Sequence, residues 1–140
     1  MPRSMDAALG DGGMRLLAEL GVAFDRYGPG WAEAGWTPTE LAANPTGAVQ
    51  GGVYAVVHDA AMNFATNSAL ERGEHGSTLD LQYQTIRAAR VGDALRVRGT
   101  VTRLTRQVAH VEAEVRTGDG DLVSRATATF LVRRPEPGQA

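Results

Sequence analysis

The hydrophobic positions of this chain follow two different periods, one on each side of a turn near residue 73. Between about Gly51 and Leu70, apolar side chains recur at steps of three and four residues, which is the spacing of a helical face. These positions are Val53, Val56, Val57, Ala60, Ala61, Phe64 and Ala65. Because most of this surface is small or apolar, we expect one long helix that is buried on several sides.

Beyond the turn, apolar and polar residues alternate with period two, which is typical of strands. The alternating segments are residues 79–84, 95–101, 111–115 and 122–132. Gly-Asp sequences at 92–93 and 118–119 supply turn residues between them. Four strands with short connections that follow one buried helix predict an α+β domain, an antiparallel sheet wrapped around a central helix.

The first 50 residues give weaker signals. Residues 14–20 predict a short amphipathic helix that ends at Gly21, and residues 31–36 (WAEAGW) predict a short strand. Residues 1–13 are polar and rich in glycine, so we expect a flexible N-terminus. The predicted organisation is therefore a flexible segment 1–13, a single domain 14–132 and a disordered tail 133–140.

Composition excludes several classes of function. With a net charge of −2, the 140-residue chain has no basic bias that would suggest nucleic acid. No apolar run approaches the roughly 20 residues that span a membrane, and the N-terminus lacks a signal-like apolar region, so a cytoplasmic protein is expected. The chain contains no cysteine or lysine, which excludes thiolate and Schiff-base chemistry. Its three histidines have no ligand spacing, so we expect neither a metal nor a cofactor.

The start of the long helix contains the strongest candidates for chemistry. Gly51 and Gly52 would leave free backbone N–H groups at a helix N-terminus, which suit a developing oxyanion, unless they only permit a tight turn or close packing. Asp59 lies among apolar neighbours, where an acid is costly to bury. Its presence is explained either by a function or by a hydroxyl or arginine partner. Asn63, one turn later, would hold a water molecule or make a plain polar contact.

A family resemblance rests on these residues and on two strand segments. Asn44, Gly47, Gln50-Gly51-Gly52 and Asp59 are followed by Thr78-Leu79-Asp80-Leu81 and the terminal strand ATATFLV. From about residue 36 to residue 132 this layout resembles the PaaI-type hotdog-fold acyl-CoA thioesterases. That family typically has a His-Gly-Gly sequence with an acid nine positions after the histidine. Here Gln50 stands in the histidine position, and Asp59 is the acid.

The resemblance implies a hotdog fold and hydrolysis of an acyl-CoA thioester. It implies that Asp59 acts as a general base on water or as a nucleophile, and that the Gly51 amide polarises the carbonyl. Gln50 and Asn44 would complete the catalytic group, although Gln50 cannot carry a proton as a histidine can. Candidate contacts to the substrate come from Gly52, Thr78, Arg87, Arg90 and Arg106, the arginines through phosphate.

Helix geometry adds a condition to that prediction. Eight helical residues separate Gly51 from Asp59, a rise of about 12 Å, so both cannot act on one carbonyl from the same helix. If the protein is a thioesterase, the acid must come from a second chain, which requires a homodimer with two shared sites. The resemblance implies the same dimer, often paired into a homotetramer.

Two other functions stay open at this stage. The chain would be a non-catalytic acyl-CoA-binding hotdog protein if Gln50 marks lost activity. It would be an enoyl-thioester hydratase if a histidine served the site, but His58 is about 100° around the helix from Asp59. The acyl group is equally open between aryl and medium-chain types, because the aromatic residues suit a pocket or a core. These residues are Trp36, Tyr54, Phe64 and Tyr83.

Overall fold

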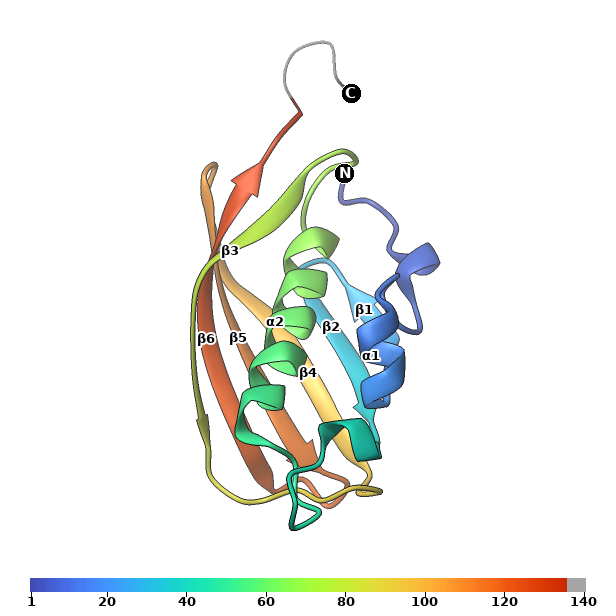
Figure 1. The fold of residues 1–140 in the computed structure, drawn as a ribbon. Helices are drawn as coiled ribbons and strands as arrows, with labels where there is room; N and C mark the ends of the chain where they lie inside the picture. Colours follow the sequence, from blue (N-terminus) through green and yellow to red (C-terminus); the bar gives the residue numbers. More distant parts are fainter. Residues whose placement is uncertain (136–140) are drawn as a thin grey trace.

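The computed structural model describes residues 1–135 and shows a long helix cradled by a curved antiparallel sheet (Figure 1). The helix α2 covers Gly51–Ser68, and the short helix α1 covers Arg15–Leu20. The strands are β1 (Val22–Gly28), β2 (Trp31–Trp36), β3 (His75–Thr85), β4 (Leu95–Leu104), β5 (Val108–Thr117) and β6 (Leu122–Arg133). Two 3-10 turns, η1 (Asp6–Ala8) and η2 (Glu40–Ala42), complete the set. The predicted α+β architecture is confirmed.

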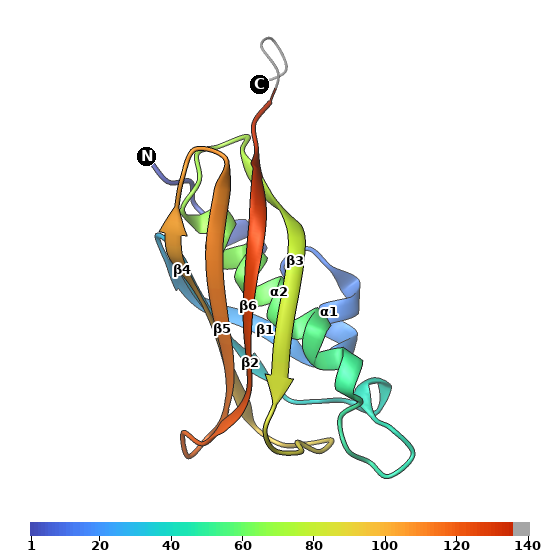
Figure 2. The same ribbon diagram turned by 90° about the vertical axis from the view of Figure 1, so that its left-hand side faces the viewer.

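The strand order differs from the chain order. The sheet runs β1-β2-β4-β5-β6-β3, and every neighbouring pair is antiparallel. Strand β3 therefore lies at one edge beside β6, as Figure 2 shows, and the chain crosses the end of the sheet before β4 begins. The period-two signal predicted the strands after α2 but not this order, because alternation records which face is buried and not which strand is the neighbour.

Strand β1 is an element that the sequence did not reveal. Val22 and Phe24 are buried, but a register shift between Phe24 and Arg26 interrupts the alternation. Gly21, with a φ of 91°, ends α1 immediately before the strand. The predicted helix at residues 14–20 and the predicted strand at residues 31–36 are confirmed.

Helix α2 is buried because the sheet touches its backbone. A Cβ atom on Gly99 of β4 would lie 2.5 Å from the carbonyl oxygen of Ala61, so only glycine permits this approach. One face of α2 places the fully buried Met62 against alanine and valine side chains of β5 and β6. Another face joins the core that β1, β2 and α1 form. This placement fixes which residues of α2 remain accessible.

The N-terminal segment packs against the domain. Met5 is buried, and the backbone N–H of Arg3 donates to the carbonyl oxygen of Leu70 at 3.0 Å. The flexibility predicted for residues 1–13 stays a prediction, but the segment has partners that its composition did not suggest. At the other end, β6 continues to Arg133, and residues 136–140 of the predicted tail lie outside the described residues.

Candidate active site

The N-terminus of α2 exposes backbone donors. Gln50 is the N-cap residue with φ −63° and ψ 135°, and its side chain makes no capping hydrogen bond. Within residues 1–135 the amides of Gly51 and Gly52 donate to no protein acceptor, whereas the Val53 amide donates to the Gln50 carbonyl at 3.0 Å. Two N–H groups therefore remain at the positive end of the helix dipole, where they can bind a carbonyl oxygen or an anion.

The two glycines at this end are not required by the fold of one chain. Neither Gly51 nor Gly52 has a positive φ, and a Cβ atom at either position would meet nothing within 4 Å. Neither a strained turn nor close packing within the described chain explains them. The open space above them is where a ligand or a second chain can approach the free amides.

The loop before α2 is shaped by Asn44. Its Oδ1 accepts hydrogen bonds from the Thr46 amide at 3.0 Å, the Thr46 hydroxyl at 2.7 Å and the Ala48 amide at 3.2 Å. Arg90 supports the same loop, because its Nη2 donates to the Thr46 carbonyl at 2.6 Å. Within one chain, Asn44 and Arg90 therefore hold the loop that leads to Gln50 in one conformation.

Asp59 lies in the middle of α2 and is oriented by a strand. The Thr78 hydroxyl, from β3, donates to Asp59 Oδ1 at 2.7 Å. In the part of the chain that the structure describes, no arginine forms a salt bridge with this carboxylate. Thr78 thus orients the acid, and no arginine side chain of the described residues pairs with its charge. This arrangement suits a base or a nucleophile.

Asn63 belongs to a clamp between α2 and the start of β3. Its Nδ2 donates to the Gly76 carbonyl at 3.0 Å, and its Oδ1 accepts from Asn67 at 2.9 Å. Asn67 in turn accepts from the Gly76 amide at 2.9 Å. Asn63 and Asn67 therefore hold the start of β3 against α2, and this places Thr78 beside Asp59. The predicted role of Asn63 in holding water stays a prediction.

An apolar cavity of about 300 Å³ begins beside Asp59. Asp59, Asn63 and Asn67 form its polar edge, and Phe24 and Phe64 stack in its wall with ring centroids 4.5 Å apart. Its size is at the lower end of small-molecule pockets. The sequence indicates Phe64 but not Phe24, because Phe24 lies in β1, which no periodic pattern predicts.

The other aromatic candidates lie elsewhere. Trp36 and Tyr54 are 1% and 2% exposed and pack edge to face in the core, so they line no part of this cavity. Tyr83 lies on the exposed edge strand β3, and its hydroxyl donates to the Gly51 carbonyl at 3.1 Å. Tyr83 thus links the edge strand to the N-terminus of α2.

One chain does not bring together Arg87 and Arg106, two of the three predicted phosphate-binding arginines. Arg87 lies in the β3–β4 connection, 3.4 Å from Asp121, and Arg106 lies in the β4–β5 turn, where its carbonyl accepts from Arg134. These connections lie at opposite ends of the sheet (Figure 2). A shared role toward one CoA molecule would require residues from two chains.

His58 is buried on the far side of α2 from the cavity. It is 0% exposed, and its Nε2 lies 2.8 Å from Ser124 Oγ. Burial lowers the pKa of His58 to about 4, so the ring is neutral at pH 7. The acid–base histidine that a hydratase would need is therefore not His58.

Residues 1–135 contain neither a clustered metal site nor a helix that could span a membrane. Among residues 1–135 there is no group of three or more His, Cys, Asp or Glu side chains that could hold a metal ion. Nor does the described part of the chain contain a helix long and apolar enough to cross a membrane.

The comparisons with known proteins identify the family and the fold of the chain. The model of the thioesterase superfamily matches residues 46–124, more than half of the chain. No curated protein sequence matches. A putative thioesterase from Ralstonia eutropha JMP134, a phenylacetic acid degradation-related protein, is 33% identical, with a TM-score of 0.76 over 84% of this chain and 89% of that chain.

Two more distant structures share the fold. A thioesterase from Haemophilus influenzae is 22% identical, with a TM-score of 0.84 over 96% of this chain and 93% of that chain. A hypothetical thioesterase from Streptococcus pneumoniae TIGR4, solved with coenzyme A, is 20% identical, with a TM-score of 0.75 over 81% of this chain and 88% of that chain. The family match spans the amide-bearing start of α2, Asp59 and Thr78. The chain therefore belongs to the thioesterase superfamily, and it is a thioester hydrolase with the hotdog fold.

Proposed function

We propose that this protein hydrolyses an acyl-CoA thioester at a site shared by two chains. The observation that supports this most directly is the pair formed by Asp59 and Thr78, 2.7 Å apart at the polar edge of an apolar cavity. The carboxylate is oriented, has no cationic partner within residues 1–135 and lies beside an apolar cavity. This arrangement suits an acyl group that fills the cavity and places its carbonyl carbon next to Asp59.

Each half of the site has a defined task in this proposal. The Gly51 amide hydrogen-bonds the thioester oxygen and stabilises the negative charge that develops there, with Gly52 and Gln50 beside it. Asp59 takes a proton from water as the water oxygen attacks the carbonyl carbon. Alternatively, Asp59 attacks the carbon itself and forms an anhydride that water then opens. In both routes the C–S bond breaks, and the CoA sulfur leaves as a thiolate that is then protonated.

The need for a second chain follows from α2 itself. Gly51 and Asp59 belong to one helix, and about 12 Å of helical rise separates them. The β3 edge offers a surface for a partner, because among residues 1–135 β3 pairs only with β6, and Leu79 is 57% exposed. A two-fold dimer would bring the Gly51 amide of one chain to Asp59 of the other, twice. The homotetramer and the cytoplasmic location stay predictions.

Aryl and medium-chain acyl groups are the proposed substrates. The stacked Phe24 and Phe64 rings support an aryl or alkyl group, and about 300 Å³ is small for a long chain. The relative from Ralstonia eutropha, related to phenylacetic acid degradation, supports the aryl option. In the dimer, Arg87 and Arg106 of different chains would meet CoA phosphates.

A panel of aryl- and alkyl-acyl-CoA thioesters tests this function. We expect turnover by the wild-type protein and a nearly complete loss of kcat in Asp59→Ala and in the isosteric Asp59→Asn, with unchanged thermal unfolding. Unchanged kcat in both variants would refute the assigned role of Asp59. If the wild type binds acyl-CoA tightly but releases no product over hours, the protein is instead a non-catalytic acyl-CoA-binding protein.

A further inference from the structure

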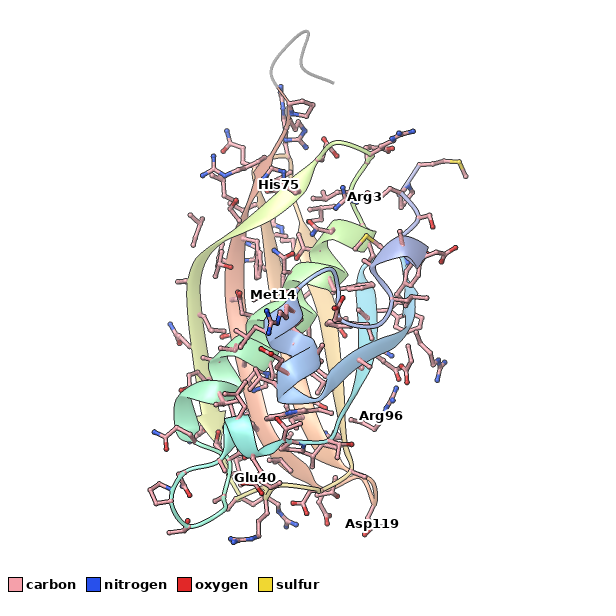
Figure 3. All side chains as sticks on the ribbon, turned by 45° about the vertical axis from the view of Figure 1, so that its right-hand side comes forward. Arg3, Met14, Glu40, His75, Arg96 and Asp119 are labelled. Atoms are coloured by element: carbon pink, nitrogen blue, oxygen red, sulfur yellow. The ribbon has the colours of Figure 1, made fainter. Side chains whose placement is uncertain are left out.

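The cavity beside Asp59 is completed by residues that precede the sheet. Its wall includes Met5, Ala8, Gly12 and Met14. These four residues come from the segment Met5–Met14, which we call the strap. In Figure 3 the labelled Met14 lies at the start of α1, in front of α2. Without the strap, one side of the cavity would be open to solvent.

The strap is tied to β1 at two points. The Tyr27 hydroxyl accepts the Met5 amide hydrogen at 2.9 Å and donates to Asp6 Oδ1 at 2.6 Å. Farther along, Gly10 and Phe24 exchange two backbone hydrogen bonds, at 2.9 and 2.7 Å. These ties keep η1 beside the cavity, and the Tyr27 ring also packs against Phe64, with centroids 5.8 Å apart.

The position of the strap relative to the acid gives it a role. Asp59 marks the reacting end, and Phe64 and Asn67 lie one and two turns farther along α2. The chain enters the strap from the end of α2, because the amide of Arg3, two residues before the strap, donates to the Leu70 carbonyl at 3.0 Å. An acyl group that extends from Asp59 past Phe64 would therefore meet Met5 and Ala8.

We propose that the strap determines which acyl groups the protein accepts, with Met5 and Ala8 closing the far end of the acyl cavity. This inference rests on the proposed thioesterase function. A hydrophobic wall can discriminate because one methylene group in such a pocket changes specificity by about 10- to 200-fold. The Met5 side chain is buried but unbranched and flexible, so it limits length less rigidly than a branched residue.

Two neighbouring alanines of η1 provide a matched test. Ala8 lines the cavity, whereas Ala7 is exposed and does not. For Ala8→Leu we expect kcat/KM for hexanoyl-CoA and phenylacetyl-CoA to fall at least about tenfold, with acetyl-CoA within about twofold of wild type. Ala7→Leu should match wild type on all three. Met5→Ala should raise the decanoyl to hexanoyl ratio of kcat/KM by about tenfold.

Equilibrium binding, measured on the same proteins, separates this inference from the proposed function. The ratio of hexanoyl-CoA to CoA affinity should fall in Ala8→Leu and stay unchanged in Ala7→Leu, whether or not the protein turns the ester over. A wild type that hydrolyses no member of the panel contradicts the proposed function, and the binding ratio still tests the strap. Identical acyl profiles and binding ratios in Ala8→Leu, Met5→Ala and wild type would overturn the inference.

Discussion

The two regions of the candidate active site lie on one helix, but one consists of backbone groups and the other of side chains. At the start of α2 the chemistry consists of backbone amides, those of Gly51 and Gly52, with open space around them. In the middle of α2 it consists of side chains, with Thr78 oriented toward Asp59 and Asn63 clamping β3. The first region needs only a helix terminus, whereas the second depends on a strand packed in register.

This difference determines how each region responds to mutation. A backbone donor survives most side-chain substitutions, because every residue except proline carries an N–H group. A carboxylate oriented by one hydroxyl loses its direction when that hydroxyl is removed. The first region should therefore fail only when the amide is removed, and the second should fail gradually as its support is removed.

Removal of the Gly51 amide should have the largest effect among the changes at Gly51, His58, Thr78 and Gln50. Proline is well tolerated at the first helical position, and Gln50, with φ −63° and ψ 135°, already has the extended conformation that precedes proline. We expect Gly51→Pro to lower kcat about 10²- to 10³-fold relative to Gly51→Ala in steady-state assays. Both variants add a Cβ atom, and proline also places its Cδ atom on the nitrogen, so their ratio measures the loss of the N–H group together with the space that Cδ occupies. Equal rates would show that the amide does not bind the oxyanion.

His58, on the buried side of the same helix, should make the free energy of unfolding depend on pH. Its pKa, about 4 in the folded protein, lies below the ordinary 6.5 of an unfolded chain, because burial disfavours the charged ring. The unfolded chain therefore binds more protons between these values, and stability is lost as the pH falls from about 6.5 to 4. The loss from this group should be about 3 kcal/mol.

The measurement is chemical denaturation at pH 7 and pH 4. His58→Gln should lose less stability over this range than wild type, and the exposed His110→Gln should behave as wild type. The same acid-induced loss in His58→Gln and in wild type would contradict the buried, neutral state of His58.

The Thr78 hydroxyl, which orients Asp59, should have a smaller effect on the rate than the Gly51 amide. We expect Thr78→Val, which keeps the shape but removes the hydroxyl, to lower kcat about tenfold, since a hydrogen bond to a charged group is worth about 1.5–3 kcal/mol. Thr78→Ser keeps the donor and should recover most of the rate. If Thr78→Val keeps the wild-type rate, the hydroxyl of Thr78 does not support catalysis and the assigned role of this hydrogen bond is wrong.

Gln50 should have the smallest effect. Its side chain is exposed and caps nothing, so a neutral hydrogen bond to substrate is the most it can contribute. We expect Gln50→Ala to change kcat/KM by no more than about fivefold. A loss above about a hundredfold would show that Gln50 replaces the family histidine in full. Gln50→His, assayed beside it, measures what the missing histidine would add.

The sequence predicted the elements whose signals are local. The helical period from Gly51 onward identified α2, and the spacing of Gly51 and Asp59 along it identified both candidate regions before any contact was known. The contact between Asp59 and Thr78 was not predictable in the same way, because 19 residues and a turn separate the two and only the register of β3 joins them.

The strap and β1 show where this limit lies. Met5 and Tyr27 lie 22 residues apart, and neither belongs to a periodic segment, so their hydrogen bond leaves no pattern in the sequence. The bulge near Phe24 interrupts the alternation that would have indicated β1. As a result, the apolar cavity could not be assembled from the sequence, even though Phe64 was already a candidate.

In the proposed dimer, each active site takes its amide from one chain and its acid from the other. Mixing two inactive variants, Asp59→Asn and Gly51→Pro, under conditions that allow subunits to exchange tests it most directly. A shared site predicts that mixed dimers regain one intact site of two, or about one quarter of the wild-type activity in an equal mixture. If the mixture stays as inactive as either variant, although subunit exchange has been verified, both groups act from the same chain and the claim is wrong.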